Sequence, residues 1–327
     1  MTTDSQVDVL SDLLHAVRLR GAIYFDFTLP EPWVAAAPES CEVAPLLMPG
    51  VEHVIEYHVV SEGSCWVALQ GQNPVQLAPG DLVAFPRGSS HVLSSTPGAR
   101  GAPQLELFRR AYSAGRLPYV VSGGAHGRGQ TRIVCAFLGC DARPFNPLLD
   151  CLPPMIHLQA DSAGDGNWLA SFLAITLSES KGQRAGSQNV LARMSELMFI
   201  EVVRRHLEHM PADQTGWLAG LRDRIVGHAL SLLHRRPGRD WTLEELASSV
   251  GTSRSVLAER FAALLGEPPM KYLTRWRMQL ASQMLLSGHT SIAGIARQVG
   301  YESEAAFSRT FKRLVGLPPA AWRQTHR

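Results

Sequence analysis

The last hundred residues of the chain repeat one pattern of hydrophobic and polar positions. In the second copy, one apolar face recurs at helical spacing over 292–299 and another over 307–314. The first copy has the same two faces over 243–250 and 257–264. Each copy therefore predicts a short amphipathic helix followed by a longer one that packs against it.

Turn and cap residues separate the two helices of each copy. Gly251 and Gly300 lie 49 residues apart, whereas Ser253 and Ser303 lie 50 apart, so the second turn is one residue longer. Glycine accepts a positive φ, and serine caps the helix that follows it. Each copy closes with a Gly and a Pro-Pro pair. This order of elements predicts two helix-turn-helix units, the arrangement that inserts a helix into the DNA major groove.

One helix should link the two units and one should precede them. Residues 269–281 contain no proline or glycine after Pro269 and are predicted to be helical, as are residues 221–233. A rigid link would hold the two reading helices at a fixed separation, which we expect to be about 34 Å, one turn of DNA.

The first half of the chain has a different pattern. Residues 4–20 place Val7, Leu10, Leu14 and Val17 at helical spacing and predict a short helix. Short β-prone runs between glycines and prolines then predict a sandwich or barrel. These runs are AIYFDF, HVIEYHVV, CWVAL, PVQL, DLVAFP, HVLSS, QLELF and TRIVCAFL.

Two longer helices are expected over 167–179 and 189–209, before a linker over 210–217. The apolar surface of the second is broader than one buried stripe requires. One side should cover the sheets, and the other either pairs with a second subunit or packs within the same chain.

The C-terminal repeats resemble the double helix-turn-helix domain of the AraC/XylS transcription regulators. The likeness covers about 221–327 and is carried above all by GYESEAAFSRTFKRLVGLPP. It implies a DNA-binding regulator of transcription, with activation expected rather than repression.

Charge and cysteine content agree with this interpretation. The net charge of +2 combines 16 Lys/Arg and 8 Asp/Glu over 222–327 with an acidic remainder. A basic C-terminal part is expected of a protein that releases counterions from DNA phosphates. The first residues lack the pattern of a secretory signal, no apolar run is long enough for a membrane helix, and the five scattered cysteines do not indicate disulfides. We expect a cytoplasmic protein without membrane contact.

A second motif lies among the predicted strands. Residues 80–91 have the form G-x5-P-x-G-x2-H, and 56–63 read EYHVVSEG. Together they resemble the two motifs of cupins over about 21–154, with Glu56 in the position of the first metal-binding histidine and Ser95 in the position of an asparagine. The sequence therefore resembles the branch of AraC/XylS regulators that has a cupin-type sensor.

Five residues form a candidate metal site in this region. His58 and His91, with Glu56 or Glu62 and with Cys135, offer the imidazole, carboxylate and thiolate ligands that suit a divalent transition metal. The alternative is that the glycines and Pro86 are turn residues and the histidines are hydrogen-bonded fillers of the barrel.

Cysteines 135, 140 and 151 cluster in the sequence. Buried cysteines usually pack as small hydrophobic residues. The alternative is a redox switch at Cys135 or Cys140, and Arg132 could stabilise a thiolate at Cys135. The resemblance to oxidant-responsive members of the same branch keeps this alternative open.

Residues on the exposed side of each reading helix are the candidates for DNA contact, because the N-terminal part of such a helix meets base edges. Arg309 and Arg254 suit guanine, and Glu259 suits a cytosine amino group. The candidates for base reading are Arg254, Ser255, Glu259, Glu304, Ser308 and Arg309. The candidates for phosphate contact are Arg275, Arg277, Lys312 and Arg313.

The sequence thus predicts an α+β protein with three parts. These are a cupin-like β-barrel sensor (1–160), a helical dimerisation segment and linker (161–215), and an all-α double helix-turn-helix domain (216–327). The expected partners are double-stranded DNA, RNA polymerase, a small-molecule, metal or oxidant effector, and a second copy of the chain. No catalytic nucleophile-base pair or phosphate-binding loop appears, so we expect no enzyme. Two alternatives remain: a metal-dependent cupin enzyme fused to a DNA-binding tail, and a degenerate barrel that only dimerises.

Overall fold

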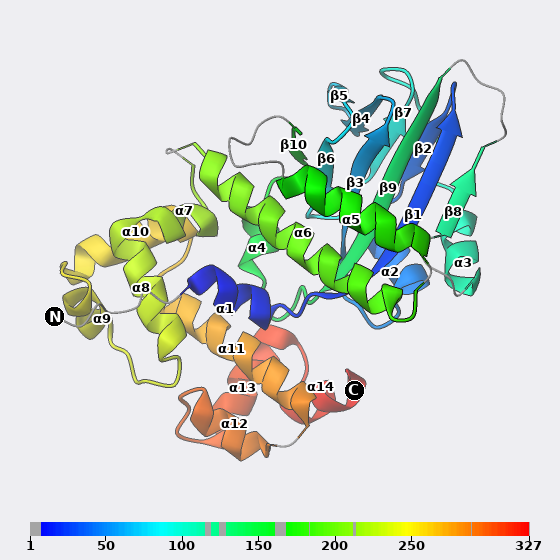
Figure 1. Ribbon diagram of the computed structural model, residues 1–327. Helices are drawn as coiled ribbons and strands as arrows, with labels where there is room; N and C mark the ends of the chain where they lie inside the picture. Colours follow the sequence, from blue (N-terminus) through cyan, green and yellow to red (C-terminus); the bar gives the residue numbers. More distant parts are fainter. Residues whose placement is uncertain are drawn as a thin grey trace. The chain divides into compact units, whose positions relative to one another are not determined.

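Contacts divide the chain into two compact units. The computed structural model describes residues 8–114, 119–123, 129–160, 168–182, 184–211, 214–288 and 290–326. One unit, the sheet unit, comprises Leu19–Cys140 and Leu152–Glu208. The other, the helical unit, comprises Met1–Arg18, Asp141–Cys151 and His209–Arg327. The predicted α+β class is confirmed (Figure 1).

Two sheets make up the core of the sheet unit. The larger sheet has the order β10-β6-β3-β9-β1-β8, and the smaller has the order β2-β7-β4-β5. The larger sheet contains β1 (Arg20–Pro30), β3 (His53–Glu62), β6 (Leu82–Phe85), β8 (Tyr119–Ser122), β9 (Gln130–Cys140) and β10 (Ile156–Leu158). The smaller contains β2 (Val34–Ala37), β4 (Cys65–Leu69), β5 (Val75–Leu77) and β7 (His91–Ser94). Side chains of both sheets pack into one core around the fully buried Phe25.

The register of the central strands decides which side chains share a face. In the antiparallel pair β3 and β9, His58 lies opposite Cys135 and Glu56 opposite Phe137. Residues two apart on a strand point to one side, so Glu56 and His58 face the same way. Tyr57 points to the other side, where its hydroxyl is hydrogen-bonded to Ser195 of α6 (Ser187–His209).

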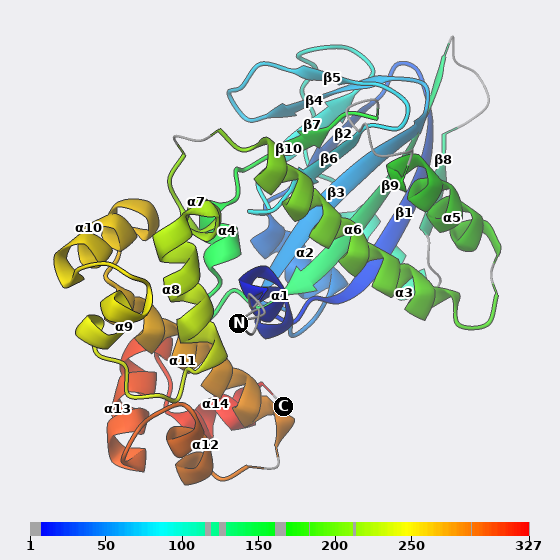
Figure 2. The same cartoon turned by 60° about the vertical axis from the view of Figure 1, so that its left-hand side comes forward.

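Helices cover that other side of the larger sheet. Figures 1 and 2 show α5 (Trp168–Gly182) and α6 (Ser187–His209) running across it, as predicted for α6 from its apolar surface. Residue 167, the predicted start of the first of these helices, lies outside the described residues. The prediction of a strand at QLELF is wrong, because these residues begin α3 (Leu105–Ala114). Glu106 pairs there with Arg109 and Arg110, the spacing of a helix surface. Helix α2 (Ser40–Leu47) packs against α3 and β3.

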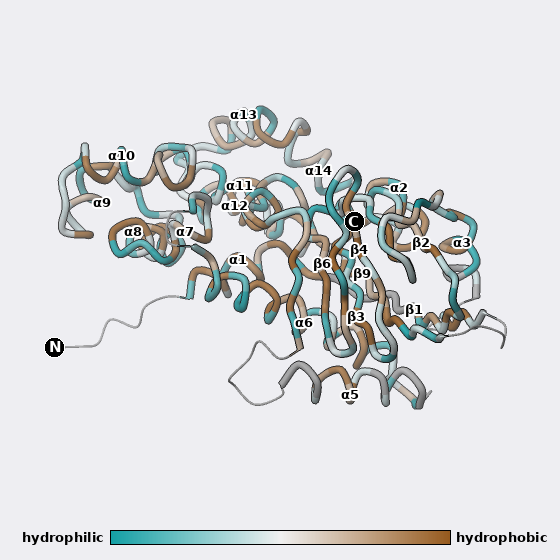
Figure 3. Tube along the Cα trace, turned by 90° about the horizontal axis from the view of Figure 1, so that it is seen from above, coloured by the Kyte–Doolittle hydropathy of each residue, from teal (hydrophilic) through white to brown (hydrophobic). Residues whose placement is uncertain are grey.

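The helical unit contains the two predicted helix-turn-helix units and more. Its elements are α1 (Val9–Ala16), α4 (Pro147–Cys151), α7 (Trp217–Arg222), α8 (Arg224–Arg235), α9 (Leu243–Ser249), α10 (Arg254–Leu265), α11 (Pro269–Ser287), α12 (Ile292–Gln298), α13 (Glu304–Val315) and α14 (Pro319–Thr325). Several of these helices carry hydrophobic and hydrophilic residues on different sides (Figure 3). No helix in the described parts of the chain is long and apolar enough to cross a membrane.

The boundaries of the two units differ from the predicted domains. Helix α1 and residues 141–151 were assigned to the sensor, but they pack with the C-terminal helices. The fully buried side chain of Gln279 on α11 connects these two segments. Its Nε2 donates to the carbonyl of Ala16 at 2.7 Å, and its Oε1 accepts from the amide of Phe145 at 2.9 Å. The predicted short helix within 4–20 is confirmed as α1, with Leu14 and Val17 buried and Leu10 half-buried; Leu13 is a further buried residue, and Val7 lies outside the described residues.

Candidate DNA interface and sensor cavity

The two helix-turn-helix units are built alike. Helices α9 and α12 each have seven residues, and α10 and α13 each have twelve. The turns have positive φ at Gly251 (72°) and Gly300 (82°). Ser253 accepts a hydrogen bond from Val256 N, and Ser303 accepts one from Ala306 N, as predicted for caps.

The reading helices bury one side and expose the other. Leu257, Phe261, Phe307 and Phe311 are fully buried. Leu314 was predicted to point inward, but it is 41% exposed, because Val315 fills the last core position of α13. The exposed sides therefore start at the N-terminal turns of α10 and α13.

The candidates for base reading lie on these exposed sides. Arg254, Ser255 and Glu259 on α10 and Glu304 and Arg309 on α13 are exposed, and Ser308 is half-buried. Arg254 lies 3.8 Å from Glu244 in a solvent-exposed pair, which is weak. All six side chains remain available for contact with a ligand on this face.

Two of the four candidates for phosphate contact are engaged within the protein. The half-buried Arg277 donates hydrogen bonds to the carbonyls of Pro237, Arg239 and Gly300. It thereby ties the segment before the first unit to the turn of the second. Sequence reasoning missed this role, because a cation on a linking helix carries no sign of the carbonyls it will meet.

Arg275 lies on the same helix as Arg277, α11, and contacts other partners. Its guanidinium lies 3.1 Å from Glu267 and stacks over the ring of Phe145 at 4.2 Å. The assignment of Arg275 and Arg277 to phosphates is therefore corrected to a structural role. Lys312 and Arg313, in contrast, are exposed on α13.

The sheet unit contains a cavity of about 240 Å³. Its lining is mostly apolar and comes from β1, β2, β3, β7, β8, β9 and α3, together with Trp33 and the segment around 102–104. Glu56, His58, His91 and Cys135 are the polar and thiol side chains of the predicted metal site that line it. The fold thus brings together four of the five predicted residues.

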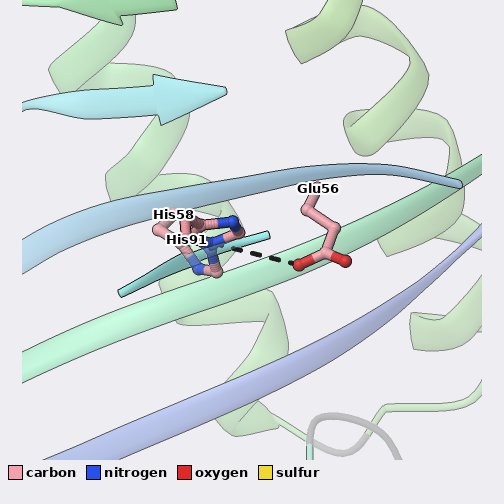
Figure 4. Close-up of side chains that lie close together, drawn as sticks. All are labelled: Glu56, His58 and His91. Carbon is pink, nitrogen blue, oxygen red and sulfur yellow. Dashed lines mark hydrogen bonds and ion pairs between the residues drawn. The ribbon is translucent and has the colours of Figure 1, made fainter. Parts of the chain in front are cut away.

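Glu56, His58 and His91 form one buried group (Figure 4). Their ligating atoms lie within 4.8 Å of one another. The Nε2 atoms of His58 and His91 are 2.7 Å apart, a hydrogen-bond distance, and His91 Nε2 lies 4.0 Å from Glu56 Oε2. The Nδ1 of His91 is 2.9 Å from the carbonyl of Ser89, so Nδ1 donates and Nε2 is the acceptor of the pair.

Burial controls the ionisation of this group. It raises the pKa of Glu56 to about 8, with a further contribution from Glu39. It lowers the pKa of His91 to about 4 and that of His58 well below its usual range. At neutral pH this group therefore holds a protonated carboxyl and two neutral imidazoles.

Glu62 does not belong to the group. The strand register shifts between Val60 and Glu62, and β3 ends there. The Glu62 side chain is 64% exposed and lies 3.6 Å from Arg132. Its prediction as a metal ligand is therefore wrong.

Cys135 lines the cavity without joining the group of three. Burial, followed by the charge of Glu56, raises the pKa of its thiol well above the usual value. Arg132 lies on the other side of β9, where it donates to both oxygens of Asp26. The expectation that Arg132 stabilises a thiolate at Cys135 is wrong, because residues three apart on a strand face opposite sides. Cys140 is also buried.

Two helix-turn-helix units joined by one helix, on a chain with a cupin-like sheet unit, define a DNA-binding regulator of transcription. Residues 8–208 match the Cupin family and residues 246–325 match a helix-turn-helix domain. The chain belongs to the AraC-like transcription regulators.

The relatives cover most of the chain. An AraC-like transcription regulator of Streptomyces lividans is 35% identical over 83% of this chain and 87% of its own length. The regulator AlkR of Acinetobacter baylyi is 30% identical over 82% of this chain and 87% of its own. Among solved structures, the DNA-binding domain of AdpA in complex with a target DNA is 27% identical, covers 32% of this chain and 94% of that domain, and has a TM-score of 0.31.

Proposed function

We propose that this regulator activates transcription from a specific DNA site when a small effector occupies the cavity of the sheet unit. The observation that carries the proposal is the pairing of a largely apolar cavity with two exposed reading helices on one chain. An effector acts through its different affinity for two arrangements of the protein. Mobility shifts and transcription from the bound promoter, each with and without candidate effectors, test it. If no compound that binds the cavity alters affinity or transcription, the proposal fails.

Arg309 is proposed to read a base, and Lys312 to contact phosphate. Both are exposed on α13, and a guanidinium can bond guanine O6 and N7 together. Arg309→Ala should cost about 1–3 kcal/mol on the specific site and relax base choice, whereas Lys312→Ala should weaken binding to all sequences alike. Titrations on matched and scrambled sites measure both effects, and equal losses for Arg309→Ala on the two sites would remove the assignment. Arg254, Ser255, Glu259, Glu304 and Ser308 are proposed to share base reading, and Arg313 to share phosphate contact.

The proposed partners of the complex are RNA polymerase and a second copy of the chain, in the cytoplasm. Exposed apolar side chains on α5 and α6, namely Ile175, Val190 and Leu197, support dimerisation. Sedimentation of wild type and Leu197→Glu tests the pairing.

A divalent transition metal is a second candidate for the cavity. The donors of Glu56, His58 and His91 are of the right kind and close together. The fit is incomplete. Two zinc–nitrogen bonds of about 2.0 Å at the tetrahedral angle would separate the nitrogens by about 3.3 Å, whereas the two Nε2 atoms are hydrogen-bonded at 2.7 Å. Among the described residues, the Nδ1 of His58 also lacks the acceptor that orients a metal-binding histidine. Elemental analysis after reconstitution with metal tests this candidate. The same measurement tests the alternative that the protein is a metal-dependent enzyme.

A redox role for Cys135 and Cys140 is the third candidate. Cys135 lines the cavity, so its oxidation would add a polar group to an apolar space. Cys135→Ser should then abolish any response to oxidants, and an unchanged response would exclude this residue.

A further inference from the structure

Glu56 is a buried acid that has no hydrogen-bond partner among the described residues and lies in the lining of a mostly apolar cavity. Its side chain is 1% exposed, and neither carboxyl oxygen has a hydrogen-bond partner in the described structure. The Nε2 of His91 lies 4.0 Å from the Oε2 of Glu56 and already accepts from His58. A buried polar group without a partner is costly, and such a group usually indicates a missing ligand, ion or water.

Aromatic rings line the same cavity. Phe25, Phe27, Trp33, Phe108 and Phe137 all contribute to its wall. The ring of Phe25 lies 5.6 Å from that of Phe27, 5.8 Å from that of Phe108 and 5.5 Å from that of Phe137. Faces of aromatic rings attract cations, most strongly where water is excluded.

The size of the cavity indicates a molecule rather than a bare ion. A water molecule takes up about 30 Å³ in the liquid, and the cavity has about 240 Å³. Most of this space borders apolar side chains rather than those of Glu56, His58, His91 and Gln104. An ion at Glu56 would leave the apolar part without an occupant.

We propose that the cavity binds a small organic cation, an amine whose nitrogen contacts Glu56 and whose apolar body lies among the aromatic rings. This inference rests on the proposed role of the cavity as the effector site and names the chemical class of the effector. A positive charge beside Glu56 favours its ionised form. The carboxylate then supplies an opposite charge and two acceptors, and the aromatic walls supply both apolar contact and cation–π attraction. A metal ion would use the same carboxylate, but it would require the two histidines to separate and would leave the aromatic wall without a role.

Calorimetric titration of the full-length protein with matched probes tests the charge of the ligand. The probes are benzylamine, benzyl alcohol and benzoate, and the corresponding hexyl amine, alcohol and acid. Within each series the body is constant and only the polar head changes. We expect each amine to bind one site per chain at least about tenfold more tightly than its alcohol and its acid.

Two isosteric variants locate the effect. Glu56→Gln should abolish the preference for amines over alcohols. Glu62→Gln removes an exposed carboxylate from the end of the same strand and should keep the preference. Circular dichroism checks that both variants are folded, and the selectivity of the wild type tests the proposal without either variant.

Equal affinity for amines and alcohols, no saturable binding by either amine, or a preference that survives Glu56→Gln would each overturn the proposal. A titration with zinc chloride alone is the last part of the experiment. Stoichiometric zinc binding that blocks the binding of amines would also overturn the proposal, in favour of a metal site. Mobility shifts on the same samples separate this result from the proposed function. Alcohols that bind the cavity and alter DNA affinity would leave the effector site intact and remove only the cationic class.

Discussion

At the scale of single residues, burial sets the chemistry of the sensor cavity. Glu56 is fully enclosed, and its pKa of about 8 lies far above the value of 4.5 for an exposed glutamate. Between these two values the unfolded chain is ionised at this position while the folded chain holds the proton. The unfolded state therefore binds fewer protons, and folding stability falls as pH rises through this range.

The Glu56→Gln substitution isolates this contribution. Without effector, wild type should lose up to about 1.4 kcal/mol of stability per pH unit relative to the variant between pH 5 and 8, because glutamine does not titrate. Above the folded pKa the difference should become constant. Urea unfolding of both proteins at each pH measures this difference in the free energy of unfolding. The histidines titrate in both proteins, so their contributions to the difference cancel. A difference independent of pH would show that Glu56 is not held protonated.

Residue type alone predicted candidates but not their surroundings. Arg309 and Lys312 were assigned to an exposed side from helical spacing, and they are exposed. The same reasoning failed for Arg275 and Arg277, because their partners come from segments distant in the chain. The prediction of Glu62 as a metal ligand failed because the alternation of side chains along a strand does not reveal a shift in strand register.

At the scale of elements, α11 organises the helical unit. It follows the first reading helix, leads to the second unit, and holds α1 and residues 141–151 through Gln279. In the sequence, α1 comes just before strand β1, and residues 141–151 directly follow strand β9. The caps and glycines made α9 to α13 predictable from the sequence, whereas nothing in the sequence marks Gln279 as a bridge between segments more than 130 residues away.

Replacing Gln279 with leucine should destabilise the helical unit. The amide of Phe145 would lose its partner in a buried position, which costs about 1–3 kcal/mol. The carbonyl of Ala16 would still accept from Gln283. Urea unfolding measures the loss, and Gln324→Leu, at an exposed position of α14, is the matched control. Equal stability of the two variants would exclude the bridge as a stabilising element.

At the scale of the whole molecule, the chain joins a sheet unit that contains a cavity to a helical unit that exposes two reading helices. Both could be anticipated, because the repeat at the C-terminus and the motif around His91 are local in sequence. The division of the chain between the units could not, since it depends on which surfaces α1 and residues 141–151 bury. The basic balance of residues 222–327 agrees with binding to a polyanion and predicts an affinity that falls with salt.

Selection of sites from a random duplex library by the full-length protein, at moderate salt, tests the central claim that the two units read DNA together. The selected duplexes should converge on two short elements about one helical turn apart, as expected of two helices in successive major grooves. A library that shows no enrichment, or one that converges on a single element with no fixed spacing to a second, would contradict it.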